Sequence, residues 1–177
     1  MTATPLASSL ARAATSADGA IVRRSGWALL WWLVLTVGGG ALVGLASNGG
    51  GSPWYVGLDK PSWTPPSWVF GPVWTTLYGL MGVAAWLVWR RGGWARQAQA
   101  LGLFELQLAL NFAWSPLFFN AQRPGLALIV MVGLWLVLAV TIRTFYDITR
   151  WAGLLLVPYL CWVTYAAALN AAIVGAN

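Results

Sequence analysis

Five long apolar segments dominate this chain and alternate with short polar connections. Each is close to the roughly 20 residues that an α-helix needs to cross about 30 Å of hydrocarbon. Because the unpaired edge of an open sheet is not tolerated in lipid, all five segments are predicted to be helices. The sequence therefore predicts an all-α membrane protein, a five-transmembrane-helix bundle with spans at residues 27–46, 67–89, 98–119, 125–142 and 151–174.

Composition supports a membrane protein of one domain. Only 8% of the 177 residues are charged and 59% are hydrophobic, whereas about 25% of residues are charged in ordinary soluble proteins. Residues 1–25, rich in Ala, Ser and Thr, are expected to form a mobile polar tail, and residues 26–177 the membrane domain. Arg23 and Arg24 are also compatible with a secretory signal, but the apolar run after them is long enough to favour an uncleaved first span.

The basic residues predict an orientation. Lys60 and Arg123 fall on one side of the predicted bundle, and eight arginines fall on the other: Arg12, Arg23, Arg24, Arg90, Arg91, Arg96, Arg143 and Arg150. Since cytoplasmic loops carry an excess of Lys and Arg, the N-terminus is expected in the cytoplasm of a bacterium, with the protein in the inner membrane. The loop at residues 47–66 should then face outward.

The ionisable residues exclude several function classes. The net charge of +6 comes from scattered residues with no basic stripe, so nucleic-acid binding is not expected. The chain has no His, which removes the usual general base and the commonest metal and haem ligand. Its one cysteine, Cys161, cannot form a disulfide within the chain. No nucleophile–base pair is visible, so we expect no metal site, no obligatory cofactor and no ordinary catalytic residues.

The proline-rich connection before the second span has the most distinctive sequence in the chain. Its prolines lack N–H groups and disfavour helical conformation in the residues before them, so Trp54 to Pro66 is predicted to be an ordered, non-helical loop. Ser67 is a suitable N-cap for the helix that follows.

Polar and aromatic residues of three spans are expected at a common depth. In the third span Gln107, Asn111, Trp114 and Ser115 lie on one helix face. A rise of 1.5 Å per residue places members of this layer roughly 6 to 18 Å below the outer ends of the spans. The layer consists of Trp74, Asn111, Trp114, Trp162, Tyr165 and Asn170.

These residues have two interpretations that the sequence alone leaves open. The amides can join helices, at about 0.6 kcal/mol for each hydrogen bond. Alternatively they line a ligand cavity beneath the loop, with Trp54, Tyr55 and Pro65 of the loop contributing from above. The prolines within or near the spans, such as Pro116, are expected to kink helices and so to open space between them.

Glu105 is the one acidic residue inside a predicted span. An ion pair with Arg143 is expected because the two lie at similar depth, and a proton-carrying carboxylate is the alternative. On the same span Ala98 and Gly102 are small residues four apart, a spacing that allows close helix approach.

Three motifs occur in order along the chain. The first comprises Trp54-Tyr55, then Leu-Asp-Lys-Pro-Ser-Trp-Thr-Pro-Pro at residues 58–66 and Val-Phe-Gly-Pro-Val-Trp at residues 69–74. The second is Ala-Leu-Asn-Phe-Ala-Trp-Ser-Pro-Leu-Phe-Phe at residues 109–119, and the third runs from Val157-Pro158-Tyr159 to Asn170. Together these motifs resemble those of the translocator protein / tryptophan-rich sensory protein family (TspO/MBR).

The resemblance implies five helices around a pocket, capped by the first loop, that takes tetrapyrroles, sterols or synthetic ligands. It maps the pocket onto Trp54, Trp74, Asn111, Trp114 and Trp162. It also implies a homodimer, for which Ala98 and Gly102 are the expected contact.

The expected function is therefore a membrane receptor or carrier for a porphyrin-type ligand, whose carboxylates would meet Lys60 or Arg123. Sterol is less expected, since Tyr165 has no basic residue after it. One alternative that the resemblance implies is a light-dependent porphyrin-degrading enzyme with reactive Trp74 and Trp162. A ligand-tuned regulatory scaffold is the other.

Overall fold

The computed structural model describes residues 26–47 and 51–177, and all regular structure in this part of the chain is helical. The tail expected at residues 1–25 lies outside the described residues. The first helix runs over Gly26–Ala46 and contains a π-helical segment, η1 (Val34–Gly38), before α2 (Gly39–Ala46). The other long helices are α4 (Ser67–Trp89), α5 (Gly93–Ser115), α6 (Pro124–Ile148) and α7 (Arg150–Ala176). A second π-helical segment, η3 (Pro116–Asn120), continues α5.

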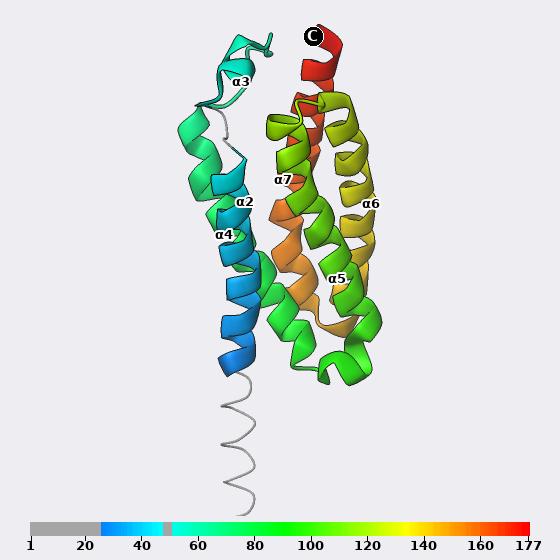
Figure 1. Ribbon diagram of the computed structural model, residues 1–177. Coiled ribbons are helices and arrows are strands. Elements are labelled where there is room, and N and C mark those ends of the chain that lie inside the picture. Colours follow the sequence, from blue (N-terminus) through cyan, green and yellow to red (C-terminus); the bar gives the residue numbers. More distant parts are fainter. Residues whose placement is uncertain (1–25, 48–50) are drawn as a thin grey trace, which may run out of the picture.

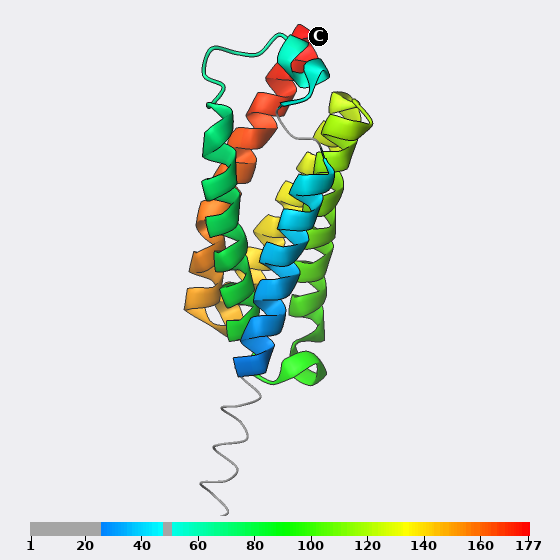
Figure 2. The ribbon, with the colours of Figure 1, turned by 60° about the vertical axis from the view of Figure 1, so that its left-hand side comes forward.

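These elements form an elongated bundle in which successive long helices run in opposite directions (Figures 1 and 2). This confirms the predicted all-α membrane architecture. Within the described residues, four helices are long and apolar enough to cross a membrane: Gly26–Ala46, Ser67–Trp89, Pro124–Ile148 and Arg150–Ala176. The fifth helix of the bundle, α5, is less apolar because it carries polar residues such as Glu105 and Gln107.

The connections at the two ends separate the charges as expected. The α4–α5 turn carries Arg90 and Arg91, and it uses Gly92 and Gly93 at φ of +136° and +62°, conformations that side chains with a Cβ rarely adopt. Arg150 begins α7 at this same end of the bundle. Lys60 lies in the connection at the opposite end (Figure 1).

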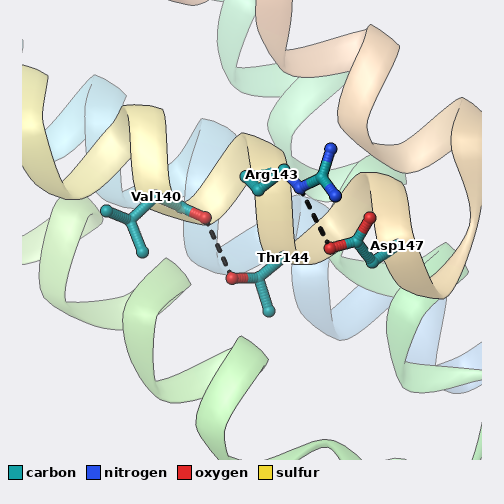
Figure 3. Close-up of polar contacts among 4 residues, drawn as sticks. All are labelled: Val140, Arg143, Thr144 and Asp147. Atoms are coloured by element: carbon teal, nitrogen blue, oxygen red, sulfur yellow. Dashed lines mark hydrogen bonds and ion pairs between the residues drawn. The ribbon is translucent and has the colours of Figure 1, made fainter.

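Helix α6 extends to Ile148, six residues beyond the predicted end of the fourth span. The added turns carry Arg143 and Asp147, whose Nε and Oδ2 atoms pair at 3.2 Å, and Thr144, whose hydroxyl donates to the carbonyl of Val140 at 2.9 Å (Figure 3). The expected pair between Glu105 and Arg143 is therefore wrong. Glu105 is exposed on the outside of α5, whereas Asp147 is one turn from Arg143 on its own helix.

The connection between the first helix and α4 contains a short helix, α3 (Pro53–Gly57), which corrects the prediction of a non-helical loop. Ser52 caps it, since its hydroxyl accepts a hydrogen bond from the Tyr55 N–H at 3.2 Å, and Pro53 occupies the first position. Residues 58–66 are non-helical, as predicted. Ser67 is the first residue of α4 rather than its cap, because Pro66 holds the capping position without a side-chain hydrogen bond.

Close packing fixes the first helix against α4 at mid-depth. The backbone at Gly40 lies against the ring of Tyr78, where an added Cβ would come within 2.2 Å of a ring carbon. Gly82 similarly faces Thr36, whose buried hydroxyl donates to the carbonyl of Trp32. Gly44, one turn after Gly40, has nothing within 4 Å of an added Cβ. The first helix therefore contacts α4 closely at Gly40 and leaves space at Gly44.

Candidate ligand cavity

A cavity of about 200 Å³ lies in the half of the bundle that α3 covers. We call it the outer cavity. Its lining comes from six elements. The residues are Gly44 of α2, Tyr55 of α3, Ser67, Phe70 and Trp74 of α4, Trp114 and Ser115 of α5, Phe118 and Phe119 of η3, and Trp162, Ala166, Leu169, Asn170 and Ile173 of α7. No charged side chain is in this set, so the walls are apolar and aromatic with a few neutral polar groups.

Aromatic rings form two facing walls. On one side Trp74 and Trp162 meet edge to face, with centroids 6.5 Å apart and planes at 89°, and Phe70 packs on Trp162 at 5.9 Å. On the other side Trp114 stacks on Phe118 at 5.2 Å with planes at 25°. Rings in these geometries hold one another firmly, and their faces and edges offer a large contact area to a flat ligand.

The π-helical segment η3 positions part of the second wall. Pro116 has no N–H to offer to the carbonyl of Phe112, so the α-helical pattern of α5 stops there. The chain continues with a wider turn, closed by a hydrogen bond from Ala121 N–H to the Pro116 carbonyl at 2.9 Å. The turn brings Phe118 and Phe119 beside Trp114 and Tyr55. At the proline where a kink was predicted, the chain therefore forms a π-helical segment.

Asn111 is buried in the bundle and joins three helices. Its Oδ1 accepts from the Tyr78 hydroxyl of α4 at 2.7 Å, and its Nδ2 donates to the Tyr159 hydroxyl of α7 at 2.8 Å. It does not line the outer cavity. It lines an adjacent space of about 60 Å³, the inner chamber, together with Gly40, Val43, Gly44, Trp74, Tyr78, Trp114 and Ser115.

Asn170 combines the two functions that the sequence left open. Its Oδ1 accepts from the Trp114 indole N–H at 3.0 Å and its Nδ2 donates to the carbonyl of Pro124 at 2.9 Å, so it links α7 to α5 and α6. It also lines the outer cavity. Both Asn111 and Asn170 therefore connect helices and lie beside open space.

Two buried polar side chains have no hydrogen-bond partner among the described residues. One is Gln107, whose Nε2 and Oε1 are both unpaired and which lines neither space. The other is Trp162, whose Nε1–H is unpaired although its ring lines the outer cavity. Because Nε1 itself is covered, a ligand in the outer cavity would meet the ring of Trp162 rather than this donor.

The loop above the cavity is tied down from α7. The Tyr165 hydroxyl donates to the carbonyl of Trp63 at 2.8 Å. The Asn177 side chain both accepts from the Asp59 N–H and donates to its carbonyl, each at 3.0 Å. Residues 51–66 therefore form a lid, and we use this name for them below.

The predicted loop residues differ in their positions. Tyr55 lines the outer cavity, whereas Trp54 packs against Phe118 at 5.6 Å without lining it, and Pro65 and Tyr165 are also outside the lining. Burial raises the pKa of the Tyr55 phenol above its ordinary value of 10.0, and the neighbouring Tyr165 adds to this. Tyr55 is thus a neutral hydroxyl at the mouth of the cavity.

Neither of the two cations expected to meet ligand carboxylates lines the cavity. The Lys60 ammonium donates to the carbonyls of Tyr55, Val56 and Leu58 at 2.7, 3.1 and 2.9 Å, so its three donors are used at the end of α3. The predicted contact between Lys60 and a ligand carboxylate stays a prediction, and it requires the ammonium to leave these carbonyls. Arg123 is exposed where α6 begins.

Sequence reasoning missed much of the apolar lining. Ala166, Leu169 and Ile173 follow Trp162 at intervals of four, seven and eleven residues, and Phe70 precedes Trp74 by four. These intervals mark a single helix face. Extending the faces of Trp162 and Trp74 along their helices would have found these residues.

The bundle, its apolar lining and its lid define a multi-pass membrane protein with an internal cavity in one half. The chain belongs to the TspO/MBR family, whose model matches residues 31–175. It is 46% identical to a translocator protein of Sus scrofa over 134 residues, which cover 75% of this chain and 79% of the relative. It is 46% identical to a translocator protein of Homo sapiens over 125 residues, 70% and 74% of the two chains. A tryptophan-rich sensory protein of Cereibacter sphaeroides is 42% identical over 144 residues, 81% of this chain and 88% of the relative.

Proposed function

We propose that this protein is a membrane receptor or carrier that binds a flat, largely apolar ligand of the tetrapyrrole class in the outer cavity. The observation that carries the proposal is the pair of aromatic walls, Trp74 with Trp162 and Trp114 with Phe118, that line one cavity. Such walls offer stacking surface to a conjugated ring. The names of the relatives, translocator protein and tryptophan-rich sensory protein, agree with transport or sensing.

The outer cavity is too small to hold a porphyrin in this conformation. About 200 Å³ is below the roughly 300 to 1,000 Å³ of most small-molecule sites, and a porphyrin needs more room than that. Binding therefore requires the lid to move outward. The hydrogen bonds that hold the lid to Tyr165 and Asn177 are few and exposed, whereas Trp54 and Tyr55 also pack on Phe118, so outward movement must separate these rings as well.

The test is a porphyrin titration followed by the quenching of tryptophan emission. Saturable quenching is expected in the wild type, with affinity reduced about threefold to tenfold in Trp162→Phe because Phe offers a smaller stacking surface than the indole. Trp151→Phe is the matched control, since Trp151 is two-thirds exposed at the start of α7 and lines neither the outer cavity nor the space beside Asn111. Equal affinity of the wild type and Trp162→Phe would contradict the proposal.

A second candidate is light-dependent breakdown of the bound porphyrin. The contact between Trp74 and Trp162 in the cavity wall favours it, because two oxidisable rings would touch the ligand and each other. Irradiation of the complex would then give a new absorbing product in the wild type and much less of it in Trp162→Phe at matched occupancy. An identical product yield in the wild type and in Trp162→Phe would show that Trp162 contributes to binding and not to the reaction.

We further propose that the protein is a homodimer in a bacterial inner membrane, with the lid outside. Ala98 and Gly102 are exposed on α5, and Gly102 has open space around an added Cβ, as a close helix contact requires. Cysteines introduced at these positions are expected to crosslink two copies in membranes. A cysteine at Ser62 of the lid should react with an impermeant thiol reagent from outside intact cells.

A further inference from the structure

The inner chamber lies one helical turn deeper than the wall of the outer cavity. Tyr78 follows Trp74 by four residues on α4, and Asn111 precedes Trp114 by three on α5, so this pair forms its deeper side. The two spaces share the lining residues Gly44, Trp74, Trp114 and Ser115. They are thus neighbours, separated by no more than these side chains.

The inner chamber has more polar walls than the outer cavity, because buried polar side chains line it. Tyr78 and Asn111 are 8% and 5% exposed and hydrogen-bond to each other. Each Asn111 amide atom makes one of the two hydrogen bonds available to it, and the Tyr78 oxygen can still accept one. Among the residues that the structure describes, no charged one lines the space.

Ser115 supplies an unused hydroxyl between the two spaces. Helical Ser and Thr residues elsewhere in this chain, such as Thr36 and Thr75, donate to the carbonyl four residues back. Within the described residues the Ser115 hydroxyl makes no such bond and has no other partner, so it is available to whatever occupies the chambers. A volume of about 60 Å³ matches two water molecules, at about 30 Å³ each, or one carbonyl-sized substituent.

We propose that the inner chamber is a polar subsite, which holds water in the free protein and takes a neutral hydrogen-bonding group of the ligand, such as an ester, amide or protonated carboxyl. Ser115 is its specificity-determining residue. A carboxylate is disfavoured, since no cation of residues 26–47 or 51–177 lines the space to offset its desolvation. This inference rests on the proposed ligand binding in the outer cavity and adds which part of the ligand is recognised.

Two positions separate the spaces for experiment. Val43 lines only the inner chamber, and Ala166 lines only the outer cavity. Val43→Phe therefore fills the inner chamber, whereas Ala166→Leu narrows the outer cavity. Ser115→Ala removes the hydroxyl and keeps the space. Thermal unfolding in detergent first establishes that all three variants fold.

The ligand test compares two neutral flat probes, protoporphyrin dimethyl ester, which carries ester carbonyls, and octaethylporphyrin, which carries only alkyl groups. One hydrogen bond predicts that the wild type binds the ester about threefold to tenfold more tightly. We expect this ratio to fall to about one in Ser115→Ala and Val43→Phe, and to persist in Ala166→Leu while both affinities drop. A ratio near one in the wild type, or one that both inner-chamber variants leave unchanged, would overturn the proposal.

A ligand-free measurement keeps the inference separate from the proposed function. In nuclear Overhauser spectra of the labelled protein, the Asn111 side-chain amide is expected to show a cross-peak to water that disappears in Val43→Phe and persists in Ala166→Leu. The exposed Asn120 amide serves as the positive control. If neither porphyrin binds, the proposed ligand class is wrong, and this cross-peak still decides the subsite. Its absence in the wild type would show the inner chamber to be dry and overturn the inference.

Discussion

The indole N–H of Trp114 donates to the side-chain oxygen of Asn170 at 3.0 Å and so joins α5 to α7 beside the outer cavity. Asn170 in turn donates to the carbonyl of Pro124, where α6 begins. One amide thus ties three helices together at the wall of the site. Its removal is expected to affect both the stability of the bundle and the shape of the cavity.

Asn170→Ala should lower the melting temperature of the detergent-solubilised protein. The substitution leaves the half-buried Trp114 indole N–H without a partner and removes the link to Pro124, whose carbonyl keeps its bond within α6, so we expect a cost of about 1 kcal/mol or more. Asn120→Ala is the control, since Asn120 is exposed and makes one bond, to the Ala46 carbonyl. Equal melting temperatures for the two variants would show that the Asn170 network contributes little.

Gly44→Val should weaken ligand binding strongly and leave the melting temperature nearly unchanged. Gly44 lines both spaces, and an added Cβ meets nothing within 4 Å, so the new side chain occupies the volume that the ligand needs. We expect at least about a tenfold loss of porphyrin affinity in the quenching titration. Gly133→Val is the matched control, since Gly133 is also open and belongs to α6, which does not line the cavity. Unchanged affinity in Gly44→Val would place the ligand elsewhere.

Gly40→Ala should lower the melting temperature, unlike a substitution at Gly44, although the two glycines are only one turn apart. The added Cβ would come within 2.2 Å of the Tyr78 ring, and Tyr78 cannot move away without losing its hydrogen bond to Asn111. Overpacking of this kind costs about 1 to 3 kcal/mol. Thermal unfolding should therefore separate Gly40→Ala from Gly44→Ala, and a Gly40→Ala protein as stable as the wild type would mean that the first helix is free to shift.

Haem and free-base protoporphyrin should bind with similar affinity, within about threefold, because the chain has no His and the phenol nearest the cavity mouth stays neutral. Burial raises the pKa of Tyr55 above 10.0, so the phenolate that could bind iron does not form between pH 7 and pH 9. Haem affinity is thus expected to be flat across this range. A rise in haem affinity with pH that Tyr55→Phe removes would show that Tyr55 binds the iron.

Much of the bundle follows from the sequence because hydrocarbon imposes simple demands on length and apolarity. The layer containing Trp74, Asn111 and Trp162 was also predictable, since helix rise fixes depth. The partner of each group was harder to predict. The i+4 spacing of Asp147 from Arg143 and the helix start at Ser52-Pro53 are both visible in the sequence, whereas depth alone favours Glu105 as the partner and proline content alone favours a non-helical loop. Pro116 marks where the α-helical pattern stops, but the π-helical turn that follows it and the free hydroxyl of Ser115 depend on tertiary packing.

Lys60 has two possible roles, to hold the lid in place or to contact the ligand, and experiment can separate them. Its ammonium donates to three carbonyls at the end of α3 and lies 4.9 Å from the centre of the Tyr55 ring. Lys60→Met should therefore loosen the lid, and we expect thermolysin to cleave it roughly fivefold faster in the ligand-free protein, with Arg123→Gln as the control.

The same variants test recognition of the ligand's carboxylates. If Lys60 only holds the lid, Lys60→Met should change the affinities for protoporphyrin and its dimethyl ester by the same factor, because loosening the lid affects both ligands alike. A selective loss of protoporphyrin binding in Lys60→Met, with unchanged cleavage of the lid, would instead show that the ammonium leaves its three carbonyls to meet a carboxylate. The same selective loss in Arg123→Gln would identify Arg123 as the partner, which its exposed position at the start of α6 allows.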